Sequence, residues 1–280
     1  MNEQIQQQSY IGKRGYTIPK TAMNSSFIDS LKQKLTLKPM IKGPYQSDEP
    51  DVYAFRESPQ KIFIPRFYGL EQFGEPLLPM ALKPGKPIHC PFINPYSTTL
   101  LRENQIPIVT AYLDHVRSGQ GGGILEAECA AGKTVMGIYI ASVLKVKTII
   151  LVHKEFLMNQ WIERMKTFLP NARVGKIQGT TEDVEDKDIV IGMIQTMYRK
   201  EYQLDDFGLT IIDEVHRIGS EEFSKTLFHV ATRYMLGISA TVERKDGLTQ
   251  LLYMFIGPRL YSHKLNGGKK HIIENVAIQF

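Results

Sequence analysis

The sequence has no long apolar run and almost no cysteine. No apolar stretch approaches the roughly 18 residues of a membrane-spanning helix, and the N-terminal MNEQIQQQSY lacks the apolar centre of a signal peptide. The two cysteines, Cys90 and Cys129, exclude a disulfide-dense secreted framework and a four-cysteine zinc site. We therefore expect no membrane partner and a reducing, intracellular environment.

An excess of charge of one sign is also small. The 280 residues include 34 lysines and arginines against 29 aspartates and glutamates, so the net charge is +5. Most of the excess lies in the first hundred residues, which hold 12 basic and 8 acidic residues. A modest basic excess suits an anionic partner, but a solvated surface explains it equally well. The 42% apolar and 22% charged residues are typical of a globular protein and exclude a disordered chain.

Proline becomes rare after the first hundred residues. Only Pro107, Pro170 and Pro258, three of the 15 prolines, lie beyond that point. Because proline removes a backbone donor and disfavours helices and central strands, residues 1–95 are expected to form a smaller, proline-rich α+β domain. Its one predicted helix begins after Ser26 as the capping residue.

From residue 96 onward, unbroken apolar strands alternate with amphipathic helices. This alternation predicts an α/β domain, a parallel sheet with helices on both faces. The expected strands are 121–128, 148–153, 188–193, 209–213 and 234–239, and the expected helices are 110–116, 135–144, 156–169, 221–230 and 248–255. Within 156–169, Trp161 lies on the apolar face, so we interpret it as a core residue rather than a platform for nucleobases.

The stretch from Ala127 to Thr134 carries the first functional signal. It reads Ala-Glu-Cys-Ala-Ala-Gly-Lys-Thr between a predicted strand and a predicted helix, where the phosphate-loop pattern G-x-x-x-x-G-K-[ST] occurs. Ala127 replaces the first glycine of that pattern. Such a loop surrounds a phosphate with backbone N–H groups at a helix N-terminus. The predicted ATP-binding residues are Cys129, Ala130, Ala131, Gly132, Lys133 and Thr134.

Two acidic residues end a later strand. Asp213 and Glu214 follow the apolar Leu209–Ile212, at the end of a strand where ligands of open α/β sheets bind. We predict that Asp213 and the Thr134 hydroxyl hold Mg²⁺. Glu214 is then placed to accept a proton from the attacking water. Lys133, Asp213 and Glu214 are therefore the predicted catalytic residues.

Together these residues resemble the superfamily 2 helicases. Asp213-Glu214-Val215-His216 resembles the DExH form of motif II, Ser239-Ala240-Thr241 resembles motif III, and Leu101-Arg102-Glu103-Asn104-Gln105 resembles the adenine-reading motif. The resemblance implies a RecA-like fold, ATP and Mg²⁺ as cofactors, and Gln105 as the reader of adenine. It also implies that His216, Ser239 and Thr241 couple hydrolysis to nucleic acid.

Within that superfamily the chain is most similar to the XPB-like group. The segments that carry this likeness are Leu151-Val152-His153-Lys154 with Gln160-Trp161, Ile194-Gln195-Thr196-Met197, and the residues from Ser239 to Gly247. The group includes the poxvirus-type transcription helicases of large DNA viruses. This implies the transcription machinery as a further partner and, if the chain is viral, the host cytoplasm or a virion as the location. The residues implied to contact nucleic acid are His153, Lys154, Gln195, Thr196, Arg244 and Lys245.

The chain departs from the group in three respects. Glu128 and Ala130 stand where XPB-like phosphate loops usually carry proline and glycine, and Lys245 reverses a charge in the group's Arg-Glu-Asp triplet. No segment after residue 250 resembles motifs IV to VI. We therefore interpret 96–260 as the first RecA-like domain and 261–280 as a connector toward an absent second RecA-like domain, supplied in cis or in trans.

Three hypotheses about function follow. The first is the N-terminal half of an ATP-dependent helicase or translocase acting on nucleic acid, with DNA favoured over RNA. The second is a non-motor binding module that uses the basic N-terminal domain, residues 1–95, to hold DNA or another nucleic acid or a transcription complex, with ATP only as a structural ligand. The third is the motor part of a restriction system, for which a nuclease motif is expected nearby and none is found.

Overall fold

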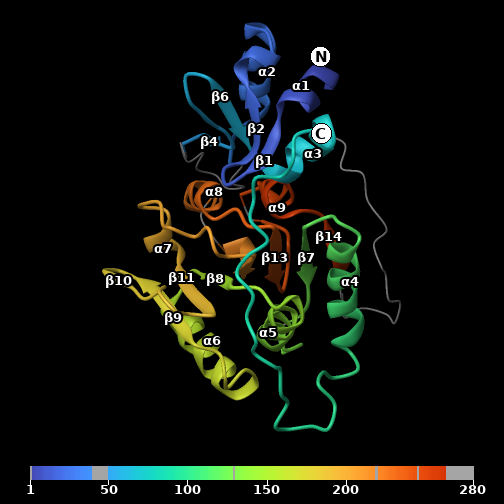
Figure 1. The fold of residues 1–280 in the computed structure, drawn as a ribbon, viewed down its shortest axis with the longest axis vertical. Coiled ribbons are helices and arrows are strands. Elements are labelled where there is room, and N and C mark those ends of the chain that lie inside the picture. The colour runs from blue at the N-terminus through green and yellow to red at the C-terminus, as the bar shows by residue number, and fades with distance from the viewer. Residues whose placement is uncertain (1, 40–49, 129, 218–219, 245, 263–280) are drawn as a thin grey trace, which may run out of the picture.

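The computed structural model describes residues 2–39, 50–128, 130–217, 220–244 and 246–262. In these ranges a small N-terminal unit packs against one side of a larger domain built on a central sheet (Figure 1). No helix within the described ranges is long and apolar enough to cross a membrane.

The N-terminal unit is an antiparallel sheet flanked by short helices. Its strand order is β1-β2-β6-β5, from β1 (Tyr10–Gly12), β2 (Gly15–Pro19), β6 (Lys61–Ile64) and β5 (Arg56–Glu57). Around it lie α1 (Asn2–Gln8), η1 (Lys20–Ala22), α2 (Ser25–Lys34), the pair β3 (Thr36–Leu37) and β4 (Val52–Tyr53), and α3 (Arg66–Phe73). The predicted helix is present as α2, but its cap is Asn24 and not Ser26, because Asn24 Oδ1 accepts the Phe27 N–H at 2.8 Å.

The larger domain contains an eight-stranded sheet of order β10-β9-β11-β8-β12-β13-β7-β14. Every neighbouring pair is parallel except β10 with β9. Its strands are β7 (Gly122–Glu126), β8 (Thr148–Val152), β9 (Val174–Gln178), β10 (Thr181–Glu182), β11 (Ile189–Met193), β12 (Leu209–Asp213), β13 (Tyr234–Ser239) and β14 (Arg259–Ser262). Its helices are α4 (Ile106–Arg117), α5 (Lys133–Leu144), α6 (Glu155–Phe168), α7 (Ile194–Met197), η2 (Val215–Arg217), α8 (Ser220–His229) and α9 (Thr249–Ile256).

Helices cover both faces of this sheet, which confirms the predicted RecA-like α/β fold. Buried residues of α4, α5 and α6 form one hydrophobic core, and buried residues of α8 and α9 belong to the other. The second core continues into the N-terminal unit through Tyr16, Ile62 and Tyr68. The five predicted strands and five predicted helices are all present within a few residues of their expected bounds.

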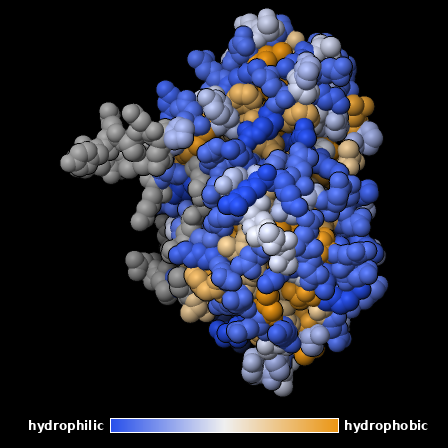
Figure 2. Space-filling view, turned by 90° about the vertical axis from the view of Figure 1, so that its left-hand side faces the viewer, coloured by the Kyte–Doolittle hydropathy of each residue, from blue (hydrophilic) through white to orange (hydrophobic). Residues whose placement is uncertain are grey.

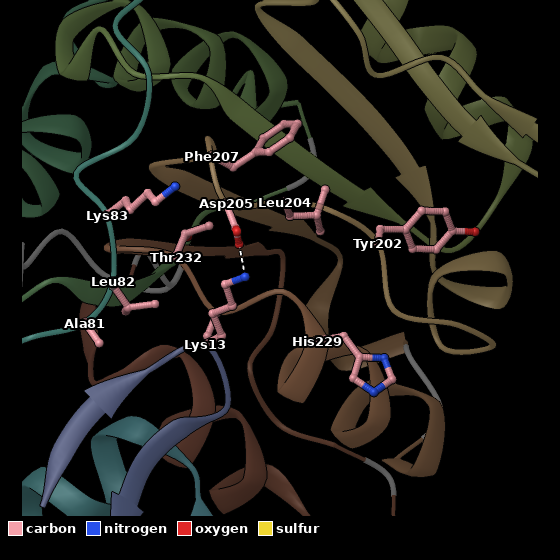
Figure 3. A pocket seen from close by; sticks show the side chains of 11 residues that line it. Lys13, Ala81, Leu82, Lys83, Tyr202, Leu204, Asp205, Phe207, His229 and Thr232 are labelled. Atoms are coloured by element: carbon pink, nitrogen blue, oxygen red, sulfur yellow. Dashed lines mark ion pairs between the residues drawn. The ribbon is translucent and has the colours of Figure 1, made fainter.

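The N-terminal unit is fixed to the sheet domain by more than this shared core. The segment that joins them bonds to the large domain at three points: the N–H of Lys86 to Asp206 O, of Ile88 to Lys145 O and of Ile93 to Phe168 O. At the β1–β2 turn, Lys13 forms an ion pair with Asp205 across a pocket of about 60 Å³ (Figure 3). The N-terminal unit therefore has a defined position on the domain that carries the strand-end acids.

Arg66, the first residue of α3, is buried at this junction. Its Nη1 donates to the Arg233 carbonyl at 2.8 Å, and the guanidinium lies 5.1 Å from the centre of the Phe67 ring. Burial lowers the pKa of Arg66 to about 10. The side chain thus joins α3 to the loop before β13 through packing and one hydrogen bond.

We predict that Arg66→Ala lowers the free energy of unfolding by about 2–4 kcal/mol, because it removes a buried side chain and leaves the Arg233 carbonyl without its donor. The control is Arg117→Ala at the exposed end of α4, which should change stability by less than about 0.5 kcal/mol. Denaturant unfolding measures both variants. Equal stabilities would contradict the junction role of Arg66.

Candidate nucleotide site and nucleic-acid edge

Parallel pairing brings the predicted site residues together. β12 and β13 run side by side with Asp213 opposite Ile238, and β13 pairs with β7 so that Ser239 lies opposite Glu126. The carboxyl ends of these three strands therefore meet at one edge of the sheet. The phosphate loop, the strand-end acids and the Ser239 segment all begin there.

The phosphate loop turns sharply between β7 and α5. Ala130 and Gly132 both have left-handed backbone conformations, with φ of 70° and 81°. Gln105 Nε2 donates to the Ala131 carbonyl at 2.8 Å, and a Cβ on Gly132 would lie 2.4 Å from that same nitrogen. Gly132 is thus required by both its conformation and its neighbour. Cys129 lies outside the described residues.

In this structure the side-chain amide of Gln105 bonds to the protein backbone, whereas the sequence predicts that it binds adenine. The side chain is buried, and its Oε1 accepts the Arg102 N–H at 3.0 Å while its Nε2 holds Ala131. Gln105 therefore braces the phosphate loop from the adenine-reading motif. Recognition of the base by Gln105 stays a prediction.

Glu214 lies at the centre of a cluster drawn from three sequence motifs. Its carboxylate is 3.5 Å from Lys133 Nζ, 3.4 Å from His216 Nδ1 and 3.5 Å from Ser239 Oγ. His216 Nδ1 and Ser239 Oγ are themselves 2.5 Å apart. A carboxylate held by several neighbours in a fixed orientation suits the role of general base that the sequence predicts.

Asp213, the residue before Glu214, is buried next to this cluster. Its Oδ2 accepts the indole N–H of Trp161 at 2.8 Å. Burial raises the pKa of Asp213 to about 6, while the Trp161 hydrogen bond acts in the opposite direction. Trp161 is a core residue, as predicted, and its contact with Asp213 was not foreseen.

The residues near Asp213 fit Mg²⁺ bound together with a nucleotide. Thr134 lies in the first turn of α5, on the same edge of the sheet as Asp213. Among the described residues, no group of three or more His, Cys, Asp or Glu could hold a metal ion. Mg²⁺ usually takes one or two protein ligands and completes its shell with phosphate oxygens and water. One hydroxyl and one carboxylate meet that requirement.

Glu126, at the end of β7, is a second buried carboxylate that the sequence reasoning missed. Its Oε1 accepts the Val242 N–H at 3.3 Å, and its Oε2 accepts from Arg259 Nη1 at 3.1 Å and from the Ser262 hydroxyl. Glu126 therefore ties the strand before the phosphate loop to the segment after β13 and to β14. The sequence does contain a signal for this residue: Glu126 is an acidic residue at the end of an apolar strand, the pattern from which Asp213 was predicted.

Four of the residues predicted to contact nucleic acid lie together at the ends of β8 and β11. Gln195 Nε2 donates to the His153 carbonyl at 3.1 Å, because β8 and β11 are parallel neighbours. The Thr196 hydroxyl accepts the Gly179 N–H at 3.0 Å, and Lys154 is exposed. Their role in binding stays a prediction.

Phe156 adds an aromatic side chain to this edge. It lies in the first turn of α6 with 63% of its surface exposed, and its ring centre is 5.9 Å from Lys154 Nζ. On the side of the molecule that carries α7 and β10, hydrophilic residues predominate and hydrophobic ones lie in small separate groups (Figure 2). The sequence signal for Phe156 is an aromatic residue two positions after the lysine that follows an apolar strand.

The remaining predicted residues after β13 lie elsewhere. Arg244 has only 3% of its side chain exposed, and its guanidinium pairs with Asp246 at 2.6 Å, which favours a structural role in this loop over the predicted contact with nucleic acid. The Thr241 hydroxyl accepts the Glu243 N–H at 3.3 Å and is not part of the Glu214 cluster. Lys245 lies outside the described residues.

The fold is the RecA-like α/β fold of helicases, and the comparisons identify the family. Residues 98–244 match the family model described as "Type III restriction enzyme, res subunit". The match covers more than half of the chain, so the protein belongs to this family.

Individual relatives carry helicase or translocase names. The chain is 32% identical over 259 residues to "Putative ATP-dependent RNA helicase L396" of Acanthamoeba polyphaga mimivirus, covering 90% of this chain and 48% of that protein. It is 35% identical over 162 residues to "DNA 3'-5' translocase XPB2" of Sulfurisphaera tokodaii, covering 58% and 35%. The chain thus spans about half the length, or less, of the curated relatives it matches.

One solved structure supports the fold over most of the chain. The crystal structure of the UvsW helicase from bacteriophage T4 has a TM-score of 0.58 at 15% identity and covers 84% of this chain and 93% of that one. At this identity the likeness concerns the fold alone. The XPB-like and viral resemblance predicted from the motifs is confirmed by the relatives.

We predict that Asp213→Asn stabilises the nucleotide-free protein at neutral pH. The pKa of Asp213 is about 6 in the folded protein and 3.8 in the unfolded chain, so between these pH values only the folded protein keeps the proton. Above about pH 6 the carboxylate is charged in both states, and the full free-energy cost of burying that charge lowers the stability of the folded protein. The neutral amide should raise the free energy of unfolding by about 1–3 kcal/mol at pH 7 and by little at pH 4.

Denaturant unfolding at the two pH values measures this difference. The exposed Asp29 on α2, replaced by Asn, serves as the control and should show no such gain. A gain that is equal at both pH values would refute the electrostatic explanation.

Proposed function

We propose that this chain is the nucleotide-binding half of an ATP-dependent translocase or helicase that acts on nucleic acid, with DNA as the substrate. The observation that carries the proposal is the Glu214 cluster, in which Lys133, His216 and Ser239 approach one carboxylate from three motifs. A chain that only stored ATP would need the phosphate loop but not a positioned base. The relatives' names, which include both a DNA translocase and an RNA helicase, support the general activity.

Each group then has a defined task. Lys133 and the loop N–H groups bind the phosphates, and Thr134 and Asp213 would hold Mg²⁺, which would neutralise negative charge on the phosphates. Glu214 orients the attacking water and accepts its proton. His216 and Ser239, bonded to each other beside Glu214, connect that carboxylate to the segment after β13.

Efficient turnover in this proposal also needs an arginine from a second RecA-like domain. An arginine directed at the γ-phosphate accelerates related reactions by about 10³–10⁵. Arg244, the nearby candidate, is paired with Asp246. The 280-residue chain is therefore expected to bind MgATP and to hydrolyse it slowly until that domain is supplied. The alternative function, the motor part of a restriction system, is compatible with the description of the family, which names a restriction enzyme subunit.

The decisive experiment is DNA-stimulated ATP turnover by this chain with a second RecA-like domain supplied. Glu214→Gln should bind MgATP with unchanged affinity and lose about 10²-fold or more in turnover, because the amide cannot accept a proton. Lys133→Ala is the contrasting control and should weaken MgATP binding at least tenfold, about 1.4 kcal/mol. Turnover that DNA does not stimulate would favour the binding module instead, and stimulation by RNA alone would reassign the substrate.

The nucleic-acid edge generates a separate prediction. Lys154→Ala should weaken binding of single-stranded DNA and reduce the slope of log affinity against log salt by about one, since one phosphate contact is lost. Phe156→Ala should weaken binding by about 1–3 kcal/mol without changing that slope, because stacking is not ionic. Fluorescence anisotropy at several salt concentrations measures both. Unchanged affinity in both variants would move the binding surface elsewhere.

A further inference from the structure

The single tryptophan of the chain touches both halves of the nucleotide site. Trp161 is fully buried, and its indole N–H donates to Asp213 Oδ2 at 2.8 Å. Its ring also lies against α5, the helix that begins with Lys133, because a Cβ on Gly137 would come within 2.7 Å of Trp161 Cη2. One rigid side chain thus separates the phosphate-loop helix from the predicted magnesium carboxylate.

The same side chain belongs to the helix that starts at the nucleic-acid edge. Lys154 precedes α6 as its capping residue, and Phe156 lies in the first turn with most of its surface exposed. Trp161 follows Phe156 by five residues, about 7.5 Å along the helix axis. Buried Leu157, Met158 and Met165 hold the rest of α6 against the sheet. A displacement at the start of α6 therefore reaches the indole through less than two turns of helix.

We infer that Trp161 is a positioning residue that fixes Asp213 and couples it to nucleic acid bound at the start of α6. This role rests on the proposed function, because it requires that the protein bind both a nucleotide and nucleic acid, with α6 linking the two binding sites. The hydrogen bond sets which way the Asp213 carboxylate points, and the close approach at Gly137 leaves the indole little freedom to turn. Nucleic acid and nucleotide both act on the position of α6 and its Trp161. Each ligand therefore changes the protein's affinity for the other ligand by the same factor.

The protein carries its own probe for the first part of this inference. Because Trp161 is the only tryptophan among 13 tyrosines, fluorescence excited on the long-wavelength side of tyrosine absorption reports on the surroundings of this one indole, which include its hydrogen bond to Asp213. Asp213→Ala should shift the emission of the free protein, whereas Asp213→Asn, which keeps an acceptor oxygen, should leave it close to wild type. Adding Mg²⁺ with ADP should change the wild-type emission and give less than one tenth of that change in Asp213→Ala.

The second part is tested by coupling. The affinity for Mg²⁺ with ADP is measured by calorimetry with and without single-stranded oligothymidine, and the ratio of the two affinities is the coupling factor. In Trp161→Phe this factor should fall toward one, while circular dichroism shows a folded protein. Lys166→Ala, an exposed lysine in the last turn of the same helix, should keep the wild-type factor.

The outcomes separate the inference from the proposed function. Identical emission of wild type and Asp213→Ala, or no response to bound Mg²⁺ with ADP, would overturn the positioning role. A wild-type coupling factor in Trp161→Phe would overturn the link through α6. If oligothymidine neither binds wild type nor alters its nucleotide affinity, the proposed function fails, and the emission measurements still decide whether Trp161 fixes Asp213. A Trp161→Phe protein that does not fold leaves the two Asp213 variants as the test.

Discussion

The parallel pairing of β7, β13, β12 and β8 is the constraint on which the rest of the molecule depends. Parallel strands all end on one side of a sheet, so the four segments that follow them must share one edge. Registers that place Ser239 opposite Glu126 and Asp213 opposite Ile238 fix the heights of the strand ends. The phosphate loop, the carboxylate predicted to hold Mg²⁺ and the predicted general base thus come together without any one segment being long or unusual.

Much of the fold could be predicted because its pattern is local. The strands of the central sheet are short unbroken apolar runs, and the helices between them have regular apolar spacing, so both are readable in windows of a dozen residues. β9 was not predicted because buried and exposed residues alternate along it: Gly175 and Ile177 are buried and Lys176 is exposed. The strand lies next to β10, the outermost strand of the sheet. β14 was missed because its four residues contain no apolar run.

The candidate site divides in the same way. Lys133, Asp213 and Glu214 were predicted because each lies in a contiguous motif with a known chemical requirement. The bonds between motifs were not predicted, because they join residues 52 positions apart for Trp161 with Asp213 and 116 apart for Glu126 with Val242. Arg244 was assigned from its place after motif III, and its burial and ion pair with Asp246 could not be read from that place; its contact with nucleic acid stays a prediction.

The carboxylate of Glu126 has a mechanical consequence. It holds Arg259 and Ser262 of β14, and β14 lies parallel to β7, so a force drawn along β14 loads this carboxylate and the strand pairing in shear instead of peeling one strand away. The same carboxylate holds the Val242 N–H. Tension on the end of β14 is thereby transmitted to the segment after β13, a few residues from Ser239 and therefore close to the candidate nucleotide site.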